Sequence, residues 1–348
     1  MTQIAHASAR GTAHPRGPLS DALLAALTSS SEADADTLMR LSESAVRACD
    51  DPRVDGDLQL SLFLLYASAY GTLDELDPGR EWDPALVAAR RMLETAFEQA
   101  LRERIVVPAL PEPTAGAVSR ALFALVADDD GPSLSRHLAR RATADQAREF
   151  LIQRSIYTLR EADPHSWAIP RLSGAPKAAL VEIQSDEYGG GRPDRVHAEL
   201  FAKAMRGAGL DDRYGAYVDH VPAITLASLN MMSMFGVNRR LIGAIVGHLA
   251  AFEMTSSIPN RLYADGLRRL GFGEDVTDYF DEHVEADAVH EQIAARDLAG
   301  ALASERPELL PDIMFGAAAC LAVDGAVAAH MLDCWTGAES SLRTAAPA

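Results

Sequence analysis

The chain has 348 residues, 48% of them hydrophobic, which is enough to bury a large core and excludes a disordered protein. Its formal net charge of −18 and the absence of a basic run argue against a nucleic-acid partner. The three cysteines form no CxxC pair, which excludes a disulfide scaffold and a thiolate zinc site. With no secretory leader and no uninterrupted apolar run of about 20 residues, we expect a cytoplasmic protein without a membrane partner.

The first third of the chain reads as a tail followed by helices. Residues 1–17 are polar and punctuated by Gly and Pro, so we expect a flexible tail there. Helical spacing begins at Ser20, and Pro84 suits the first turn of a helix that reaches about Arg104. The proline-rich stretch 107–116 is typical of a connector. We therefore place an N-terminal helical unit at residues 18–110.

The rest of the chain is also predicted to be helical, because long alternating β-branched runs are scarce. The expected helices are at about 117–127, 133–142, 144–162, 174–189, 193–207, 211–236, 239–256, 259–270, 275–300 and 308–336. They form one domain at residues 111–338, followed by a tail at 339–348. The fold class predicted is an all-α bundle rather than an α/β fold.

The segment DEHVEADAVHEQ carries the sharpest chemical signal. His283, Asp287 and His290 are spaced i, i+4, i+7 and share one narrow stripe of a helix. Two imidazoles and a carboxylate on one stripe can form half of a site for iron, manganese or zinc. The neighbouring acids leave open a solvated helix face that contains histidines by chance.

A second signal joins two helices across a glycine loop. Glu187 precedes His197 by ten positions, and Gly189, Gly190, Gly191 and Pro193 lie between them. These residues must break or reshape the helix, and the break allows both side chains to converge on a metal. The alternative is a plain joint with exposed ends.

Glu161 is the third candidate. It lies near the C-terminal end of an expected helix, where the negative end of the helix dipole disfavours a carboxylate. A bound cation would compensate it, and so would the adjacent Arg160.

Glu253 is the only acid in the apolar stretch 241–255. A buried carboxylate needs a partner or must lose its charge. That partner is either a metal or an arginine such as Arg239 or Arg261.

Together these seven side chains supply four carboxylates and three imidazoles. Four carboxylates balance the charge of two Fe²⁺ ions in a low-dielectric core, and neutral histidines complete the coordination. The set predicts a dimetal site without the paired Glu-x-x-His motifs of ferritin-like proteins.

On these residues, the chain resembles the haem-oxygenase-like diiron oxidases and oxygenases over about residues 145–300. The matching pattern is an acid on the first core helix, Glu-x9-His on the second, a lone acid on an intervening helix and His-x3-Asp-x2-His on the third. The resemblance implies a haem-oxygenase-like bundle with an additional N-terminal helical unit that serves dimerisation. It further implies two iron ions, O₂ as co-substrate, an external electron donor and a homodimer. The implied metal ligands are Glu161, Glu187, His197, Glu253, His283, Asp287 and His290.

Within this family, an additional histidine ligand at or next to the position of His283 resembles the feature that distinguishes N-oxygenating members. The resemblance therefore implies oxidation of a substrate amine to a hydroxylamine, and on to a nitro group if the reaction repeats. It suggests a 2-aminoimidazole-like heterocycle or a guanidine-type amino acid from natural-product biosynthesis as substrate. Two alternatives stay open: a diiron desaturase, lyase or decarboxylase acting at carbon of a fatty or amino acid, and a non-catalytic helical protein.

Other polar residues near these motifs are assigned less specific roles. We expect His165 in a turn, His220 at a helix end and His248 packed in the core. Tyr157 and Tyr188 are close in sequence to candidate ligands and are candidates for supporting them or closing a pocket.

Overall fold

The computed structural model describes residues 13–29 and 34–344, apart from the side chains of residues 285–288. The described residues are helices joined by turns and loops and contain no strand, which confirms the all-α prediction. Two compact units emerge from the contacts between residues. The first comprises Met1–Arg104, Arg213–Met231 and Leu342–Ala348, and the second comprises Ile105–Asp212 and Met232–Ser341. Residues 213–231, predicted to belong to the domain at residues 111–338, pack with the first unit instead.

The first unit is a small helical cluster. Its elements are α1 (Pro18–Thr28), α2 (Ala35–Ala48), α3 (Gly56–Tyr70), η1 (Pro78–Arg80) and α4 (Pro84–Arg104). Aspartate side chains cap the first turns of α2 and α3, and Pro84 begins α4 as the sequence predicts. Helix α3 is buried from Leu58 to Ala67, and it packs against α1 and α4. It forms the core of this unit.

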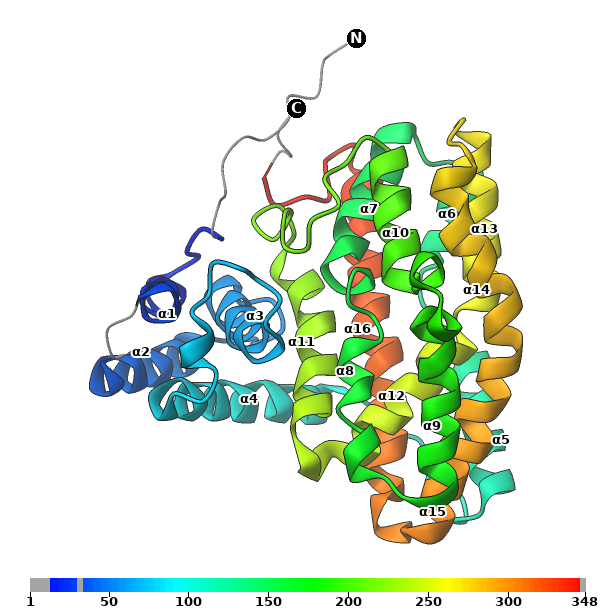
Figure 1. The fold of residues 1–348 in the computed structure, drawn as a ribbon, viewed down its shortest axis with the longest axis horizontal. Helices are drawn as coiled ribbons and strands as arrows, with labels where there is room; N and C mark the ends of the chain where they lie inside the picture. Colours follow the sequence, from blue (N-terminus) through cyan, green and yellow to red (C-terminus); the bar gives the residue numbers. More distant parts are fainter. Residues whose placement is uncertain (1–12, 30–33, 345–348) are drawn as a thin grey trace. The chain divides into compact units, whose positions relative to one another are not determined.

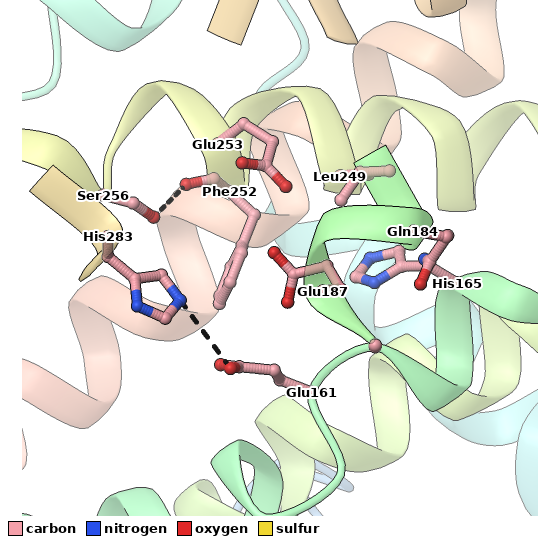
Figure 2. Close-up of a pocket in the computed structure, with 10 residues that line it drawn as sticks. Glu161, His165, Gln184, Glu187, Leu249, Phe252, Glu253, Ser256 and His283 are labelled. Carbon is pink, nitrogen blue, oxygen red and sulfur yellow. Dashed lines mark hydrogen bonds and ion pairs between the residues drawn. The ribbon is translucent and has the colours of Figure 1, made fainter. Parts of the chain in front are cut away.

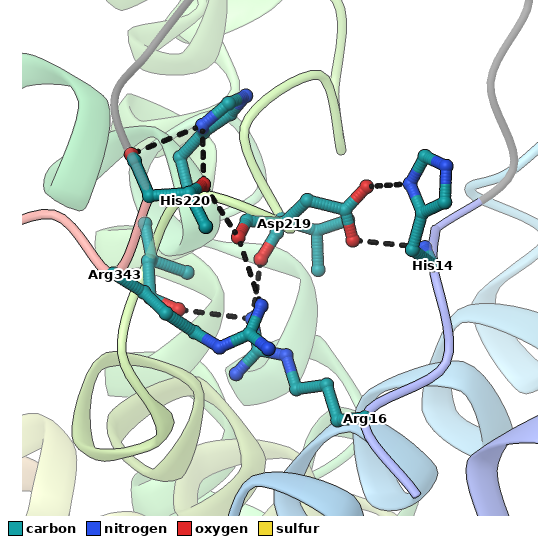
Figure 3. A network of polar contacts seen from close by, with 8 residues as sticks. His14, Arg16, Asp219, His220 and Arg343 are labelled. Atoms are coloured by element: carbon teal, nitrogen blue, oxygen red, sulfur yellow. Dashed lines mark hydrogen bonds and ion pairs between the residues drawn. The ribbon is translucent and has the colours of Figure 1, made fainter.

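Polar contacts tie together three chain segments of the first unit (Figure 3). Arg16 donates to the carbonyls of Val218 and Val221, and the imidazole of His14 contacts Asp219. The backbone of Arg343 donates to the carbonyl of His220. Burial and the nearby Arg343 lower the pKa of Arg16 to about 10. Residues 13–17 and 340–344, assigned to tails from the sequence, therefore make defined contacts, whereas 1–12 and 345–348 lie outside the described residues.

The second unit is a larger helical bundle (Figure 1). It begins with α5 (Ala115–Ala127), α6 (Leu134–Arg140), α7 (Ala144–Thr158), α8 (Asp163–Ser166), η2 (Ile169–Arg171) and α9 (Gly174–Glu187). Two short turns, η3 (Gly189–Gly191) and η4 (Pro193–Arg195), lead into α10 (His197–Gly207). Helix α11 (Ala223–Val237) begins in the first unit and ends in the second. The bundle continues with η5 (Arg239–Leu241), α12 (Ile242–Met254), α13 (Ser257–Arg269), α14 (Glu274–Gln292), the π-helical η6 (Ile293–Gly300), α15 (Ala301–Glu305), η7 (Pro307–Leu309) and α16 (Leu310–Thr336).

Two of these helices differ from the predicted bounds for identifiable reasons. The helix expected over 144–162 ends at Thr158, and Pro164 accounts for the early end because its ring would clash with the carbonyl four residues earlier. The helix expected from residue 211 begins at Ala223, directly after Pro222. Proline restricts the residue before it to extended conformations, which separates the preceding turns from the helix.

The core of the second unit is the close pair α12 and α16. A Cβ added at Gly247 would lie 1.8 Å from the carbonyl oxygen of Ile313, and one at Gly316 would lie 2.0 Å from that of Ala244. The helices are parallel and in backbone contact, so neither position has room for a side chain. By length and composition alone, Pro307–Thr336 is apolar enough to cross a membrane, a test that buried core helices also pass. Half of its apolar window is buried in the protein, and the packing on α12 accounts for that composition.

Candidate metal centre

Four elements of the second unit end or bend where the predicted ligands lie. Glu161 is in the turn between α7 and α8, Glu187 is the last residue of α9, and His197 is the first residue of α10. Glu253 is one residue before the end of α12. All four side chains are buried, with at most 8% of each residue exposed. Polar side chains that the sequence places far apart therefore meet inside the bundle.

The glycine loop brings Glu187 and His197 together. Gly189, Gly190 and Gly191 all adopt positive φ, which is accessible to glycine without strain. The chain turns back within a few residues, and the Nδ1 atom of His197 lies 3.0 Å from Oε2 of Glu187. The predicted break between the two helices is present. The two side chains converge across it, and the alternative of a plain joint with exposed ends does not hold for them.

Helix α14 supplies the remaining predicted ligands. His283 and His290 are both buried and are two turns apart on the same stripe. A solvated helix face is therefore excluded for these two histidines. Asp287 also belongs to α14, but its side chain lies outside the described residues. The helix continues directly into the π-helical η6, a widened geometry that is common next to functional sites.

The six described side chains form two groups that share one carboxylate. Ligand atoms of Glu161, Glu187, His197 and His283 all lie within 4.8 Å of one another. The second group, Glu187, Glu253 and His290, satisfies the same distance limit. Figure 2 shows the carboxylates of Glu161, Glu187 and Glu253 turned toward one small space, with His283 facing Glu161. Glu187 is the carboxylate that the two groups have in common.

Apart from the hydrogen bond between His197 and Glu187, the direct contacts within the groups are long. Nε2 of His283 is 3.7 Å from Oε1 of Glu161, and Nδ1 of His290 is 3.6 Å from Oε2 of Glu253. These distances exceed those of hydrogen bonds. As a result, Glu161 Oε1 and His290 Nδ1 are buried without any hydrogen-bond partner among the described residues. Buried polar atoms are almost always satisfied, so two unpaired ones that face carboxylate and imidazole donors fit a site that metal ions complete.

Comparison with known proteins agrees with this geometry. Residues 148–325 match the profile of a family described as iron-containing redox enzymes. The matched segment spans more than half of the chain and includes every candidate ligand named above. The chain belongs to this family.

Solved structures show the same fold. Two structures of a CADD-like protein of unknown function from Nostoc punctiforme PCC 73102 are similar to this redox enzyme, with a TM-score of 0.50 for each. One is 18% identical over 63% of this chain and 97% of that protein, and the other is 17% identical over 65% and 97%. At this identity the likeness concerns the fold alone. No curated protein matches the sequence.

Within the candidate site of this redox enzyme, the surroundings shift the pKa values of the two acids of the first group in opposite directions. Burial, reinforced by the charge of Glu187, raises the pKa of Glu161 to about 8. Burial also opposes the charge on Glu187, but the attraction and hydrogen bond of His197 outweigh it and lower that pKa to about 2. Burial and repulsion from His197 lower the pKa of His283 to about 3. His283 is therefore neutral at pH 7, which is the form that binds a metal.

The second group is held by a hydrogen-bonded histidine. Burial disfavours the charge on His290, yet its contacts with Glu253 and Asp186 outweigh this and raise its pKa to about 9. Nε2 of His290 is 3.0 Å from Oδ2 of Asp186, which leaves Nδ1 directed at Glu253. Such a carboxylate fixes the orientation of a metal-binding imidazole. Asp186 was not identified from the sequence, although it immediately precedes Glu187.

Glu161 is supported by groups that the sequence analysis also missed. The hydroxyl of Tyr279 donates to Oε2 of Glu161 at 2.7 Å, and the carbonyl of Tyr279 contacts Nδ1 of His283 at 2.7 Å. Arg154, half-buried among aromatic rings, stacks over Tyr157 at 4.8 Å and lends its positive charge to Glu161. Tyr279 precedes His283 by four residues, or about one helical turn, on α14. This spacing places it on the same stripe as the candidate ligands and could have identified it from the sequence.

The arginines that the sequence offered as partners for Glu161 and Glu253 do not form ion pairs with them. Arg160 pairs with Asp163, and the contact of Glu253 is His290 rather than Arg239 or Arg261. Tyr188 is 40% exposed and bonds with Asp163 and Ser166, so it does not reach the ligands. The expected core position of His248 is confirmed.

A small cavity of about 20 Å³ adjoins the ligands, with room for one or two water-sized atoms. Its lining combines Glu161, Glu187, Glu253 and His283 with the apolar Leu249 and Phe252. Gln184, one turn before Glu187, also lines it and is 3% exposed. Neither its amide nitrogen nor its carbonyl oxygen has a hydrogen-bond partner among the described residues. The cavity thus contains a donor and an acceptor that a bound molecule can satisfy.

Proposed function

We propose that this iron-containing redox enzyme is a diiron N-oxygenase that uses O₂ to oxidise the amine nitrogen of a small substrate. The observation that carries the proposal is the pair of ligand groups sharing Glu187, one of which contains two imidazoles. With His290 in the other group, three imidazoles are available as nitrogen donors to two ions. The additional histidine, His283, is the feature that the family resemblance associates with nitrogen oxidation.

The residues present fit two iron ions. Glu161, His197 and His283 would hold one ion, Glu253 and His290 the other, and Glu187 both, with Asp287 as a further proposed ligand. Iron bound there supplies the activation of O₂ that no amino-acid side chain can provide. The overall reaction is R–NH₂ + O₂ + 2 H⁺ + 2 e⁻ → R–NHOH + H₂O. An external electron donor must deliver the two electrons.

The protein's own part is to orient ligands, exclude water and position the amine. Tyr279, Arg154 and Asp186 fix the carboxylates and imidazoles from behind. Leu249 and Phe252 give the cavity apolar walls, which limits bulk water. Gln184 faces the cavity with one acceptor and two donors, a combination suited to the amino nitrogen of a heterocycle or a guanidine group, the part of the substrate that a cavity of about 20 Å³ can admit. We propose these as substrate classes.

The other expectations from the sequence continue as parts of the proposal. We propose a cytoplasmic homodimer in which residues 18–110 serve dimerisation. Oxidation at carbon, as by a desaturase, lyase or decarboxylase, is the competing reaction for the same metal ligands.

Single-turnover chemistry tests the proposal. The protein is loaded anaerobically with Fe²⁺, mixed with one equivalent of O₂ and a panel of 2-aminoimidazoles, guanidino acids and fatty acids, and the products are analysed by mass spectrometry. We expect an amine to gain one oxygen atom from ¹⁸O₂ at nitrogen, and the His283→Gln variant to lose this product. A desaturated or decarboxylated product, or the same N-oxidised yield from His283→Gln, would contradict nitrogen oxidation at this site.

A further inference from the structure

A second pocket of the larger unit is lined almost entirely by arginine. It has a volume of about 420 Å³, and its lining consists of Arg171, Arg239, Arg240, Arg306, Ile242 and Leu309. The four arginines come from η2, η5 and the start of η7, segments that are far apart in the sequence. On a chain with a formal net charge of −18, this is a local concentration of positive charge. Four guanidinium groups around one hollow repel each other unless an anion lies between them.

Two arginines of the pocket are held by specific contacts, while Arg239, Arg240 and Arg306 are exposed to solvent and accessible to a soluble ligand. The guanidinium of Arg171 donates to the carbonyls of Gly236 and Val237 at the end of α11, the latter at 2.8 Å. It also faces the ring of Trp167, with its central carbon 6.0 Å from the ring centroid. Arg306 is held by Glu308, with Nε 3.1 Å from the carboxylate. Arg239 has no ion-pair partner within the described part of the chain.

The helices around the pocket add to its positive potential. The parallel pair α12 and α16 begin at Ile242 and Leu310, beside lining residues of the pocket, and no side chain caps either helix. Helix N-termini carry a partial positive charge that favours anions. Glu308 pairs with Arg306 and Asp312 lies in the first turn of α16, so the four arginines of the lining outnumber these two acids.

The pocket is separate from the metal centre. Helix α12 connects them, since Ile242 lines the pocket and Glu253 is a metal-ligand candidate near the other end. At 1.5 Å per residue the two positions are about 17 Å apart. A molecule in the arginine pocket therefore occupies its own site and does not depend on bound iron.

We propose that this pocket binds a soluble small molecule that carries two or more phosphate or carboxylate groups. Planar guanidinium groups recognise such anions through paired hydrogen bonds, and several groups converging on one hollow favour a ligand with several negative charges. A diphosphate group matches the charge of the hollow and fits within its volume. The site can serve the anionic portion of a co-substrate or an effector.

Titration calorimetry of the full-length protein with inorganic pyrophosphate tests this site at constant ionic strength. We expect one saturable site per chain, and at least tenfold weaker binding in Arg239→Gln and in Arg306→Gln. Arg239→Lys keeps the charge but loses the paired donors, so it should bind with intermediate affinity. Arg136→Gln, at an exposed arginine on α6, is the matched control and should bind like the wild type.

Two further experiments test whether binding is specific to this pocket and to a soluble ligand. The Glu187→Gln variant should bind pyrophosphate like the wild type, because it alters only the metal centre; this separates failure of the anion site from failure of the proposed function. Vesicles containing phosphatidic acid test a lipid headgroup as the source of the phosphate. The proposal is overturned by no saturable pyrophosphate binding, by equal weakening in Arg136→Gln, or by binding to vesicles alone.

Discussion

The glycine loop between α9 and α10 offers a sharp test of how the fold builds the metal centre. Replacing Gly189 with alanine places a Cβ 2.7 Å from the backbone nitrogen of Val196 and 2.8 Å from the carbonyl carbon of Arg195. Ordinary van der Waals contact begins at 3.4 Å, so the backbone must move by about 0.7 Å. Val196 immediately precedes His197, and a displacement of this size exceeds the tolerance of about 0.5 Å for a working site.

Gly190 is the matched control for this substitution. Both glycines have positive φ, +76° for Gly189 and +57° for Gly190, but a Cβ at Gly190 meets no atom within 4 Å. Gly190→Ala therefore carries only the left-handed backbone strain of about 1–2 kcal/mol. For a domain of 150–250 residues, that corresponds to a decrease in Tm of about 2–8 °C. Gly189→Ala should lose more stability and also move His197 from Glu187.

Anaerobic Fe²⁺ titration with equilibrium dialysis, together with thermal unfolding, distinguishes the two variants. We expect Gly190→Ala to bind iron like the wild type and Gly189→Ala to bind one of its two ions at least tenfold more weakly. Equal iron affinities for the two variants would refute the claim that this loop positions His197 for a metal.

Three further predictions concern the groups around the site. Asp186→Asn weakens the hydrogen bond that orients His290, so we expect about 10–100-fold weaker binding of one iron by the same titration; unchanged binding of both would show that Asp186 is not required. Gln184→Leu removes a buried amide without partners, so Tm should rise and iron stoichiometry should hold, while KM for the amine increases about tenfold; an unchanged KM would exclude substrate contact. Burial lowers the pKa of His165 to about 4, and burial with the charge of His165 lowers that of His248. Because the unfolded chain binds protons first, the metal-free protein should lose stability as pH falls from 6.5 toward 4, by up to about 1.4 kcal/mol per pH unit for each histidine. His248→Phe should reduce this slope in urea unfolding at pH 7 and pH 5, and an identical slope would contradict the assignment.

Helix positions and the identities of six ligand candidates were accessible from the sequence because each depends on local pattern, whereas their grouping into one site was inferred from charge balance and from the family resemblance. Proline positions and apolar spacing located most helices, and the i, i+7 spacing of His283 and His290 located their common stripe. The carboxylates Glu161 and Glu253 were identifiable because each stands in a context where a charge needs compensation. These signals require no knowledge of how distant segments pack.

Features that depend on packing between distant segments were missed. The role of Glu187 as the carboxylate common to both groups follows from where α9 ends relative to α12 and α14, which periodicity does not report. Arg154 and Asp186 carry no distinguishing pattern in the sequence. Their roles arise only when α7 brings Arg154 near Glu161 and when α9 packs so that Asp186 meets His290 of α14. The four arginines of the second pocket likewise come from separated segments.

We propose that two metal ions share Glu187, and iron stoichiometry tests this proposal most directly. The wild-type chain should bind two Fe²⁺ ions under anaerobic conditions, measured by dialysis and elemental analysis. Glu253→Gln, which alters only one group, should retain one ion, whereas Glu187→Gln should lose both. A wild-type stoichiometry of one or none, or a Glu187→Gln variant that keeps two ions, would contradict a dimetal centre built around this carboxylate.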